Sequence, residues 1–210
     1  YGESAPYGKR KVIDATTIPQ PANFYGDSKL QADVAVRELE DDTYKVIVLR
    51  PPMIYGKGSK GNYRTLVKLA KKLPIFPDVD NERSMLYIEN LCEFLCQIML
   101  IKSYARNSVV LLPQNGEWTK TSDMIKMIAK ASGKKIVESK GFAPAVWIGS
   151  KMPGKIGGLV NKAFGNNCYE HQISEYAGIR YQRTGLKDSV RKAEKDNKKE
   201  SKMDSEESHT

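Results

Sequence analysis

Lys45-Val46-Ile47-Val48-Leu49-Arg50 is the stretch that decides the fold class of this chain. The run is short, almost continuously apolar and rich in β-branched residues, which is typical of a strand buried on both faces of a parallel sheet. A helix is predicted from Asn23, its cap, to about Glu40, with Leu30, Val34 and Leu39 facing inward. A helix followed by such a strand indicates an α/β protein.

Similar patterns predict the remaining elements of the chain. We expect helices at about 63–72, 88–101, 121–132 and 186–193, and strands at 84–87, 107–112 and 135–137. Residues 74–80 are expected to form a connection, and residues 142–164 a small irregular or helical segment. Residues 194–210 are polar, charged and without aromatic side chains, which predicts disorder.

The charge and the apolar content of the chain limit the kinds of partner that it can bind. The chain has 210 residues, a formal net charge of +9 and no apolar run near the ~18 residues that span a bilayer, so no membrane span is expected. Basic residues are spread along it, with a modest cluster at Lys151, Lys155 and Lys162, and aromatic residues do not alternate with them. This predicts a solvated basic surface and no nucleic-acid site, with an anionic metabolite or weak polyanion contact as alternatives.

Cysteine and histidine usage indicates a reducing compartment. Cys92 and Cys96 are predicted to share one buried helix face, and Cys168 stands alone. With two histidines, neither beside the cysteine pair, we expect reduced thiols, no metal site and a cytoplasmic location. The first residue is Tyr1 rather than Met and no leader follows it, so we also expect a truncated chain.

Tyr25 and Lys29 are the leading candidates for chemistry. Their spacing places a phenol and an ammonium one helical turn apart on one face of the predicted helix. An adjacent ammonium favours the ionised phenolate, which can act as a general base. Tyr7 and Lys11 have the same spacing in a turn-like context, so the spacing alone leaves a chance pairing open.

Three segments occur in an order that carries a family resemblance. They are Tyr25-Gly26-Asp27-Ser28-Lys29, Leu49-Arg50-Pro51-Pro52-Met53-Ile54-Tyr55-Gly56 and Arg83-Ser84-Met85-Leu86-Tyr87-Ile88-Glu89-Asn90-Leu91. The chain resembles the extended short-chain dehydrogenase/reductases, and within them the nucleotide-sugar epimerase/dehydratase branch of the UDP-glucose 4-epimerase type. The opening Tyr1-Gly2-Glu3 is similar to the end of that family's serine-bearing segment.

The resemblance implies an architecture with two domains. It implies the carboxyl-terminal part of a Rossmann-like doubly wound parallel sheet, formed by residues 1–56 and 84–113. A small α/β substrate-binding domain would comprise residues 57–83 and 114–191, and residues 192–210 would form a disordered charged tail. Members of the family often dimerise, so a homodimer is one implied assembly.

The resemblance also implies roles for single residues. Tyr25 would be the catalytic acid/base, and Lys29 would hold the nicotinamide ribose and favour the phenolate of Tyr25. Both would therefore contact the cofactor, NAD or NADP, together with Pro52 and Met53. Asn62 and Arg83 would bind the pyrophosphate of a nucleotide-sugar substrate. A helix cap is the alternative role for Asn62, and an exposed charge at a strand edge is the alternative for Arg83.

Departures from the family pattern bear on cofactor and substrate. Met53 stands where the sugar epimerases often have asparagine, and Asn90 where aspartate is common. The family's Gly-rich turn is missing, because the run 56–61 matches G-x-G-x-x-G only after the wrong strand. We therefore expect cofactor binding to require a region that precedes Tyr1, where the catalytic serine or threonine would also lie.

The sequence thus leads to one functional hypothesis with alternatives. We expect an NAD(P)-dependent nucleotide-sugar epimerase that passes through a transient ketosugar, with hydride transfer assisted by Tyr25 and Lys29. The alternatives are a dehydratase or reductase of the same family, and a non-catalytic remnant or binding module. A basic polyanion-binding protein is a third alternative.

Overall fold

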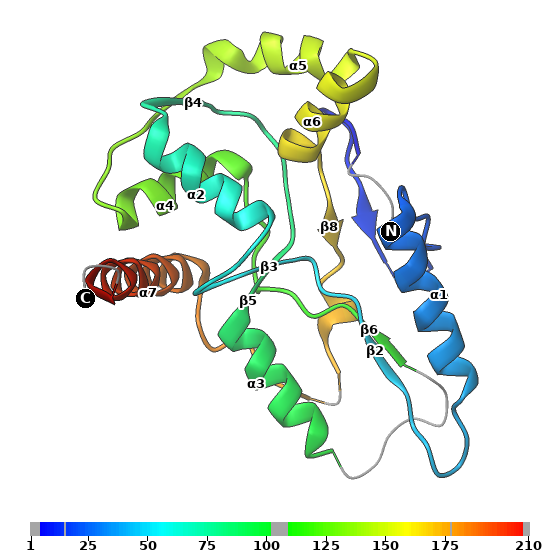
Figure 1. The fold of residues 1–210 in the computed structure, drawn as a ribbon. Coiled ribbons are helices and arrows are strands. Elements are labelled where there is room, and N and C mark those ends of the chain that lie inside the picture. Colours follow the sequence, from blue (N-terminus) through cyan, green and yellow to red (C-terminus); the bar gives the residue numbers. More distant parts are fainter. Residues whose placement is uncertain (1–4, 15, 102–108, 177, 208–210) are drawn as a thin grey trace.

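The chain is built from short parallel strands and the helices that follow them (Figure 1). The computed structural model describes residues 5–14, 16–101, 109–176 and 178–207, and of residues 197–207 only the backbone. Four strand pairs, all parallel, lie within these ranges. The predicted α/β class is confirmed.

The predicted strand at 45–50 is β2 (Ile47–Leu49), which pairs with β6 (Val109–Leu111) so that Ile47 is opposite Val109. Its residues are half-buried rather than buried on both faces, because the sheet at this place has two strands. Part of the strand predicted at 107–112 is confirmed as β6, while residues 107 and 108 lie outside the described residues.

A second parallel pair joins β3 (Met53–Tyr55) to β5 (Met85–Tyr87), with Met53 opposite Met85 and Tyr55 opposite Tyr87. The strand at 84–87 is confirmed as β5. We did not predict β3 or β4 (Ile75–Pro77), which pairs with β7 (Val137–Ser139). Both missed strands have three residues and adjoin prolines, so neither shows a recognisable period. A fourth pair joins β1 (Val12–Ile13) to β8 (Cys168–Tyr169).

The first four helices fall close to their predicted positions, the next two divide the segment 142–164, and the last continues past its predicted end at 193. They are α1 (Phe24–Glu38), α2 (Asn62–Lys72), α3 (Ile88–Met99), α4 (Thr121–Ala131), α5 (Ala143–Lys151), α6 (Gly154–Phe164) and α7 (Leu186–Glu207). The predicted cap of α1 is confirmed, since Asn23 Oδ1 accepts a hydrogen bond of 2.9 Å from the Gly26 N–H. The N-cap residue of α4 is Lys120, and the Thr121 N–H donates to Asn81 Oδ1 over 3.0 Å.

The predicted inward face of α1 is not buried. No residue of α1 is buried, and Leu39, just after its end, is 63% exposed. The physical reason is the small sheet beside α1, whose two strands are too narrow to cover a 15-residue helix. A similar correction applies to α3, where Cys92 and Cys96 are exposed. The buried positions of α3 are Asn90, Phe94 and Ile98, two residues out of phase with the cysteines.

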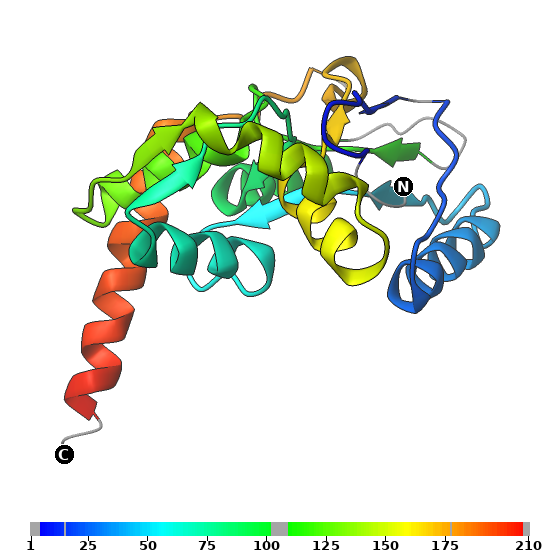
Figure 2. The same cartoon turned by 90° about the horizontal axis from the view of Figure 1, so that it is seen from above.

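The main core lies where α2, α4 and α7 pack together over β3 and β5 (Figures 1 and 2). Its large side chains include Tyr55, Tyr63 and Tyr87, whose rings meet at 5.4 Å between Tyr55 and Tyr63 and 5.6 Å between Tyr55 and Tyr87. A second cluster joins α3 to β2, β5 and β6 through Phe94 and Leu86. The core therefore supports the strand ends that carry the predicted site.

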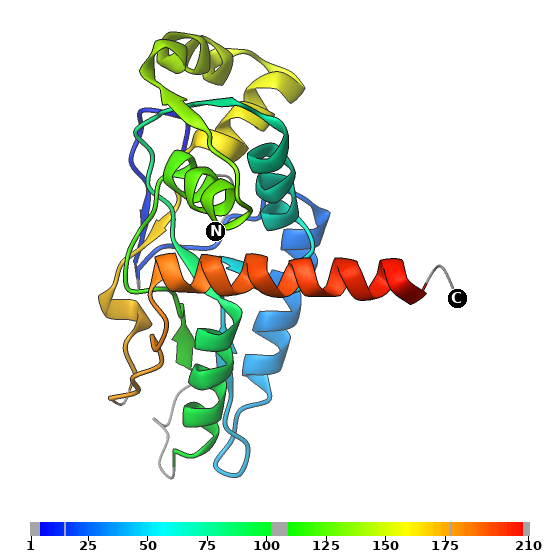
Figure 3. The same ribbon diagram turned by 90° about the vertical axis from the view of Figure 1, so that its left-hand side faces the viewer.

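The predicted disordered tail, 192–210, is wrong for residues 192–207. α7 continues as one helix to Glu207, and Figure 3 shows its far end projecting from the body. Composition alone does not predict this helix, because the helix depends on tertiary contacts. Ala193 and Glu194 are fully buried, and Glu194 Oε1 accepts a hydrogen bond of 3.0 Å from the Tyr63 hydroxyl. Anchored there, the helix propagates into the charged sequence.

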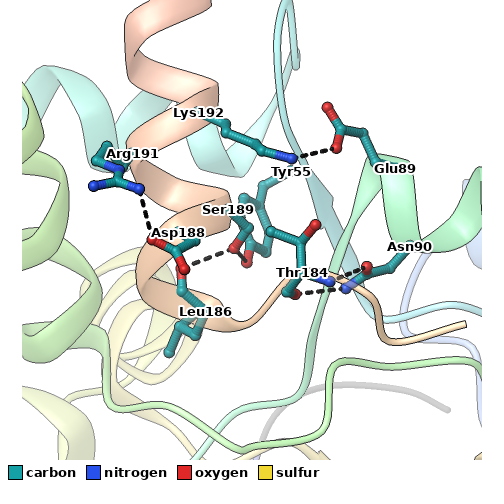
Figure 4. Close-up of polar contacts among 9 residues, drawn as sticks. All are labelled: Tyr55, Glu89, Asn90, Thr184, Leu186, Asp188, Ser189, Arg191 and Lys192. Carbon is teal, nitrogen blue, oxygen red and sulfur yellow. Dashed lines mark hydrogen bonds and ion pairs between the residues drawn. The ribbon is translucent and has the colours of Figure 1, made fainter.

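Polar contacts hold the start of α7 against the sheet (Figure 4). The hydroxyls of Tyr55 and Ser189 are 2.5 Å apart, and Asn115 Nδ2 donates to Tyr55 over 3.0 Å. Asn90 exchanges two hydrogen bonds with the backbone of Thr184, at 3.0 and 3.1 Å. Asn90, which departs from the family pattern, thus fastens the segment that leads into α7.

Candidate functional site

The predicted catalytic pair lies on the first two turns of α1. Lys29 Nζ is 5.7 Å from the centre of the Tyr25 ring, so the two side chains share one face of the helix as the spacing predicts. Tyr25 is 70% exposed and Lys29 is exposed. A phenol and an ammonium in this position are open to a ligand that approaches the helix from outside.

The position of α1 depends on an ion pair with the strand beside it. Asp33 accepts hydrogen bonds of 2.7 Å from Arg50 Nε and from Arg37 Nε. Partial burial opposes ionisation of Asp33, but the hydrogen bonds and charges of Arg50 and Arg37 hold its pKa below the usual value. Because Arg50 follows β2 and precedes Pro51-Pro52, this contact links the helix of Tyr25 to the segment that carries Pro52 and Met53.

The second and third family segments lie side by side in the structure. They form the β3·β5 pair, so Met53 adjoins Met85 at the beginning of both strands. Tyr55 and Tyr87 at the ends of these strands are buried. Burial raises the pKa of Tyr55 to about 12, despite its hydrogen bonds with Ser189 and Asn115. Tyr55 is thus a protonated structural tyrosine, whereas Tyr25 is exposed.

One pocket of about 180 Å³ gathers three of the six predicted site residues. Met53, Asn62 and Arg83 line it, from β3, the start of α2 and the residue two before β5. Its other walls come from α2, α4, α6 and β5. They are Thr65, Leu66, Leu69, Met85, Thr121, Leu159, Lys162 and Ala163. Tyr25, Lys29 and Pro52 do not line this pocket.

Arg83 occupies a wall of this pocket in a definite geometry. Its Nη1 donates hydrogen bonds to the backbone oxygens of Lys162 over 2.5 Å and Ala163 over 3.4 Å, at the end of α6. A cation at a helix C-terminus is favourable there. Desolvation by burial lowers the pKa of Arg83. The side chain is half-buried and bonded to α6, which excludes the alternative of an exposed charge at a strand edge.

Asn62 is the first residue of α2 and is exposed. The residue at the cap position is Gly61, and no side chain caps the helix there. The alternative of a capping role for Asn62 is therefore not what the structure shows. Asn62 lines the pocket at the N-terminus of a helix, where anions are favoured.

Sequence reasoning missed the contribution of α6 to the pocket. Leu159, Lys162 and Ala163 lie some eighty residues from Arg83 in the chain, and the region was expected only to be irregular or helical. One signal in the sequence pointed to this contribution. Lys162 belongs to the basic cluster for which binding of an anionic metabolite was the alternative to a solvated surface. Long-range packing brought that lysine to the pocket.

The glycines of the loop 56–61 have a packing explanation rather than a cofactor-binding one. A Cβ on Gly56 would lie 2.2 Å from Ile88 Cγ2, so only glycine fits where β3 ends against α3. Gly58 and Gly61 have φ values of +67° and +80° and turn the chain into α2. The close approach at Gly56 is to another side chain, and the loop follows β3 as expected for this family's later strand.

None of the predicted site residues lines a second concavity, of about 900 Å³. Its lining is Gly116, His171, Ser174, Glu175, Tyr176, Gly178, Ile179, Arg180, Tyr181, Gln182 and Arg183. It is open and mostly formed by a single connecting segment before α7. Its walls carry no pair of groups that the predicted chemistry requires.

The fold described above is shared with solved Rossmann-like proteins. UDP-glucuronic acid 4-epimerase from Bacillus cereus, in complex with NAD, is similar with a TM-score of 0.64 at 18% identity, over 94% of this chain and 58% of that chain. RMD from Pseudomonas aeruginosa, complexed with NADPH, is similar with a TM-score of 0.62 at 17% identity, over 90% of this chain and 59% of that chain. The likeness confirms the predicted Rossmann-like fold class.

The sequence places the chain in a family. The family model described as the RmlD substrate binding domain matches residues 7–142, more than half of the chain, and the chain belongs to that family. UDP-glucose 4-epimerase of Vibrio cholerae is 30% identical over 118 residues, 54% of this chain and 35% of that protein. The resemblance to the extended short-chain dehydrogenase/reductases of the nucleotide-sugar epimerase type is confirmed. The chain spans about a third of the length of the Vibrio relative.

Proposed function

We propose that this chain supplies the acid/base pair and the substrate pocket of an NAD(P)-dependent nucleotide-sugar epimerase. The observation that carries the proposal is the Tyr25 and Lys29 pair on one exposed face of α1, with Lys29 Nζ 5.7 Å from the Tyr25 ring. The names of the Vibrio and Bacillus relatives, both 4-epimerases of UDP-sugars, support the same reaction class.

Tyr25 would move the proton of a sugar hydroxyl. The phenolic oxygen takes that proton when the carbinol carbon loses its hydride, and it returns a proton when the ketosugar is reduced from its other face. Lys29 would offer N–H donors to ribose hydroxyls. When bound, the nicotinamide would supply the acceptor and donor of the hydride.

The substrate would enter the pocket lined by Met53, Asn62 and Arg83. A guanidinium has five N–H donors, and the bonds to α6 use only Nη1, so Arg83 can also bind a phosphate oxygen. Lys162 adds a second cation and Leu159 an apolar wall. A pyrophosphate between these groups fits the donor set. Pro52, next to Met53, would lie between the sugar and the cofactor.

The residues present fit one part of a dinucleotide better than the other. Tyr25 and Lys29 offer exposed polar groups of the kind that hold a ribose. The glycines at 56–61 are explained by packing against Ile88 and by the turn into α2, so we assign no pyrophosphate of the cofactor to them. We propose that residues 1–56 and 84–113 belong to the cofactor-binding part, and residues 57–83 and 114–191 to the substrate-binding part.

The test uses the complete product of the gene that encodes this chain. The protein is incubated with NAD and UDP-glucose or UDP-N-acetylglucosamine, and the sugars are separated by chromatography. Tyr25→Phe removes the transferable proton and should lower kcat by about 10²- to 10⁴-fold. Tyr44→Phe, which alters an exposed tyrosine outside the site, is the matched control and should leave kcat unchanged. Equal turnover by Tyr25→Phe and the parent would refute the proposed role.

The alternatives give different results in the same experiment. A dehydratase would release water and yield a stable ketosugar. A reductase would show no turnover in this mixture, and it would consume reduced cofactor in stoichiometric amounts once NADPH, as in the RMD complex, and a ketosugar are supplied in place of NAD and the UDP-sugar. A non-catalytic module would bind the UDP-sugar saturably, with affinity lost in Arg83→Met, and show no turnover of any kind.

A further inference from the structure

Helices α5 and α6 form a hairpin at one end of the molecule (Figure 1). The turn between them contains Gly154, whose φ of +72° is one that glycine adopts readily. The helices approach closely, since a Cβ on Gly157 would lie 1.9 Å from the Met152 carbonyl oxygen. Asn161 Nδ2 also donates to the Ser150 carbonyl over 3.1 Å. The hairpin is therefore a packed element with a defined outer face.

The hairpin exposes large apolar side chains. Val146 and Ser150 of α5 and Gly157 of α6 point inward and are buried. Six large apolar side chains of the hairpin and its approach are exposed, by 44% to 69% of their surface. They are Phe142, Trp147, Ile148, Met152, Ile156 and Leu159. Such a concentration of exposed apolar side chains on a soluble domain marks an interaction surface.

The hairpin and its approach also carry exposed positive charges. Lys140, Lys151, Lys155 and Lys162 are exposed, and residues 139–169 contain no aspartate or glutamate. No ion pair within the described part of the chain involves these four lysines. Lys151 Nζ lies 5.9 Å from the centre of the Trp147 ring, so apolar and cationic groups are interleaved. We call these ten residues the hairpin surface.

We propose that the hairpin surface docks on a membrane that carries anionic headgroups. A helix surface on which lysines stand beside Trp, Ile and Leu can lie at a bilayer interface, with its apolar side chains between the acyl chains and its cations on the headgroups. Trp147 suits the headgroup level, where indole rings are enriched. The apolar side chains favour this partner over a nucleic acid, which would leave Ile148 and Ile156 in water.

Docking of this kind needs no spanning segment. No helix among the described residues combines the length and the apolar character needed to cross a bilayer, and α5 and α6 have 9 and 11 residues. The surface borders the pocket, since Leu159 and Lys162 belong to both. A docked molecule would therefore hold the pocket beside the headgroups. The inference rests on exposure and charge and is independent of the reaction proposed above.

The test measures partition of the chain onto vesicles by sedimentation. We expect binding to vesicles of phosphatidylglycerol and phosphatidylcholine in equal parts, and weak binding to phosphatidylcholine alone. Each lysine at an anionic surface contributes a factor of about five, so Lys151→Glu with Lys155→Glu should lower the partition coefficient at least about 25-fold. The matched control, Lys68→Glu with Lys72→Glu, makes the same change of charge at exposed positions of α2 and should retain most of the binding.

A second set of variants tests the apolar contribution. Ile148→Ser should lower the partition coefficient by at least about tenfold, because a buried isoleucine contributes roughly 1.5 kcal/mol or more. Met99→Ser, at an exposed position of α3, should leave the coefficient unchanged. Brominated lipids should quench Trp147 fluorescence, and this quenching should disappear in Trp147→Phe. Quenching that persists in Trp147→Phe would place the contact elsewhere and overturn the proposal.

Other results would also overturn it. The proposal fails if the chain does not bind to the anionic vesicles. Binding to duplex DNA without binding to vesicles would assign the lysines to a polyanion. Self-association that is abolished by Ile148→Ser, again without vesicle binding, would assign the surface to a second copy of the chain.

Discussion

Arg50 Nε lies 2.7 Å from Asp33 Oδ2 and ties the helix of Tyr25 and Lys29 to the strand that leads to Met53. Arg37 binds the other carboxylate oxygen over 2.7 Å. Since no residue of α1 is buried, this ion pair is a principal contact that sets where the proposed catalytic pair lies. The position of the proposed acid/base therefore depends on electrostatics more than on packing.

Loss of this contact should destabilise the chain and make its free energy of unfolding less dependent on pH in the acid range. Asp33→Asn should lower the free energy of unfolding by about 1–3 kcal/mol at neutral pH. The folded pKa of Asp33 is lowered, so its contribution is present above the unfolded value of 3.8 and is lost as the pH falls through the folded pKa. Urea unfolding at neutral pH and at about pH 3 should show a smaller acid loss in Asp33→Asn than in the parent. Asp42→Asn, in an exposed loop, should match the parent.

Tyr55 should contribute to stability through its hydroxyl. Tyr55→Phe leaves Asn115 and Ser189 without this partner and should cost about 1–3 kcal/mol in urea unfolding. The folded pKa of Tyr55 is raised to about 12, so its contribution is present below the unfolded value of 10.0 and is lost between these two values. The variant should lose less stability than the parent across that alkaline window. An equal loss in both proteins would contradict the burial of this phenol.

Glu194 should decide whether the charged end of the chain is helical. Glu194→Ala removes the acceptor of the buried Tyr63 hydroxyl and should destabilise the chain by about 1–3 kcal/mol. Hydrogen exchange should show weaker protection of the amides of α7 in this variant. Lys195→Ala changes the next residue, which is exposed, and should retain the parent protection. Rapid exchange throughout 192–207 in the parent would instead support a disordered tail.

Replacing either of two neighbouring glycines of α6 by alanine should change the stability of the chain, in opposite directions for the two positions. A Cβ at Gly157 would lie 1.9 Å from the Met152 carbonyl oxygen, so Gly157→Ala should cost about 1–3 kcal/mol by forcing the hairpin open. A Cβ at Gly158 meets nothing within 4 Å, so Gly158→Ala should stabilise α6 by about 0.5–1 kcal/mol. Thermal unfolding of the two variants provides the comparison. Similar shifts of the melting temperature in both variants would show that α5 and α6 are not closely packed.

Most helices and several strands could be predicted because their signals are local. The spacing of apolar residues located α2, α3 and α4, and Asn23 located the start of α1. β3 and β4 were missed because three residues beside prolines carry no period, and their strand character comes from the partners β5 and β7. The buried face of α3 was also predicted wrongly. Several faces of this helix are apolar, and only tertiary packing decides that the face with Phe94 is the buried one.

The sequence by itself determined the family, the α/β class and the shared face of Tyr25 and Lys29, because motif order and helical spacing are properties of the local chain. Only the tertiary structure decided that Met53, Asn62 and Arg83 line one pocket with α6, and that α7 continues past Ala193. Those outcomes depend on side chains far apart in sequence, whose contacts exist only once the chain has folded.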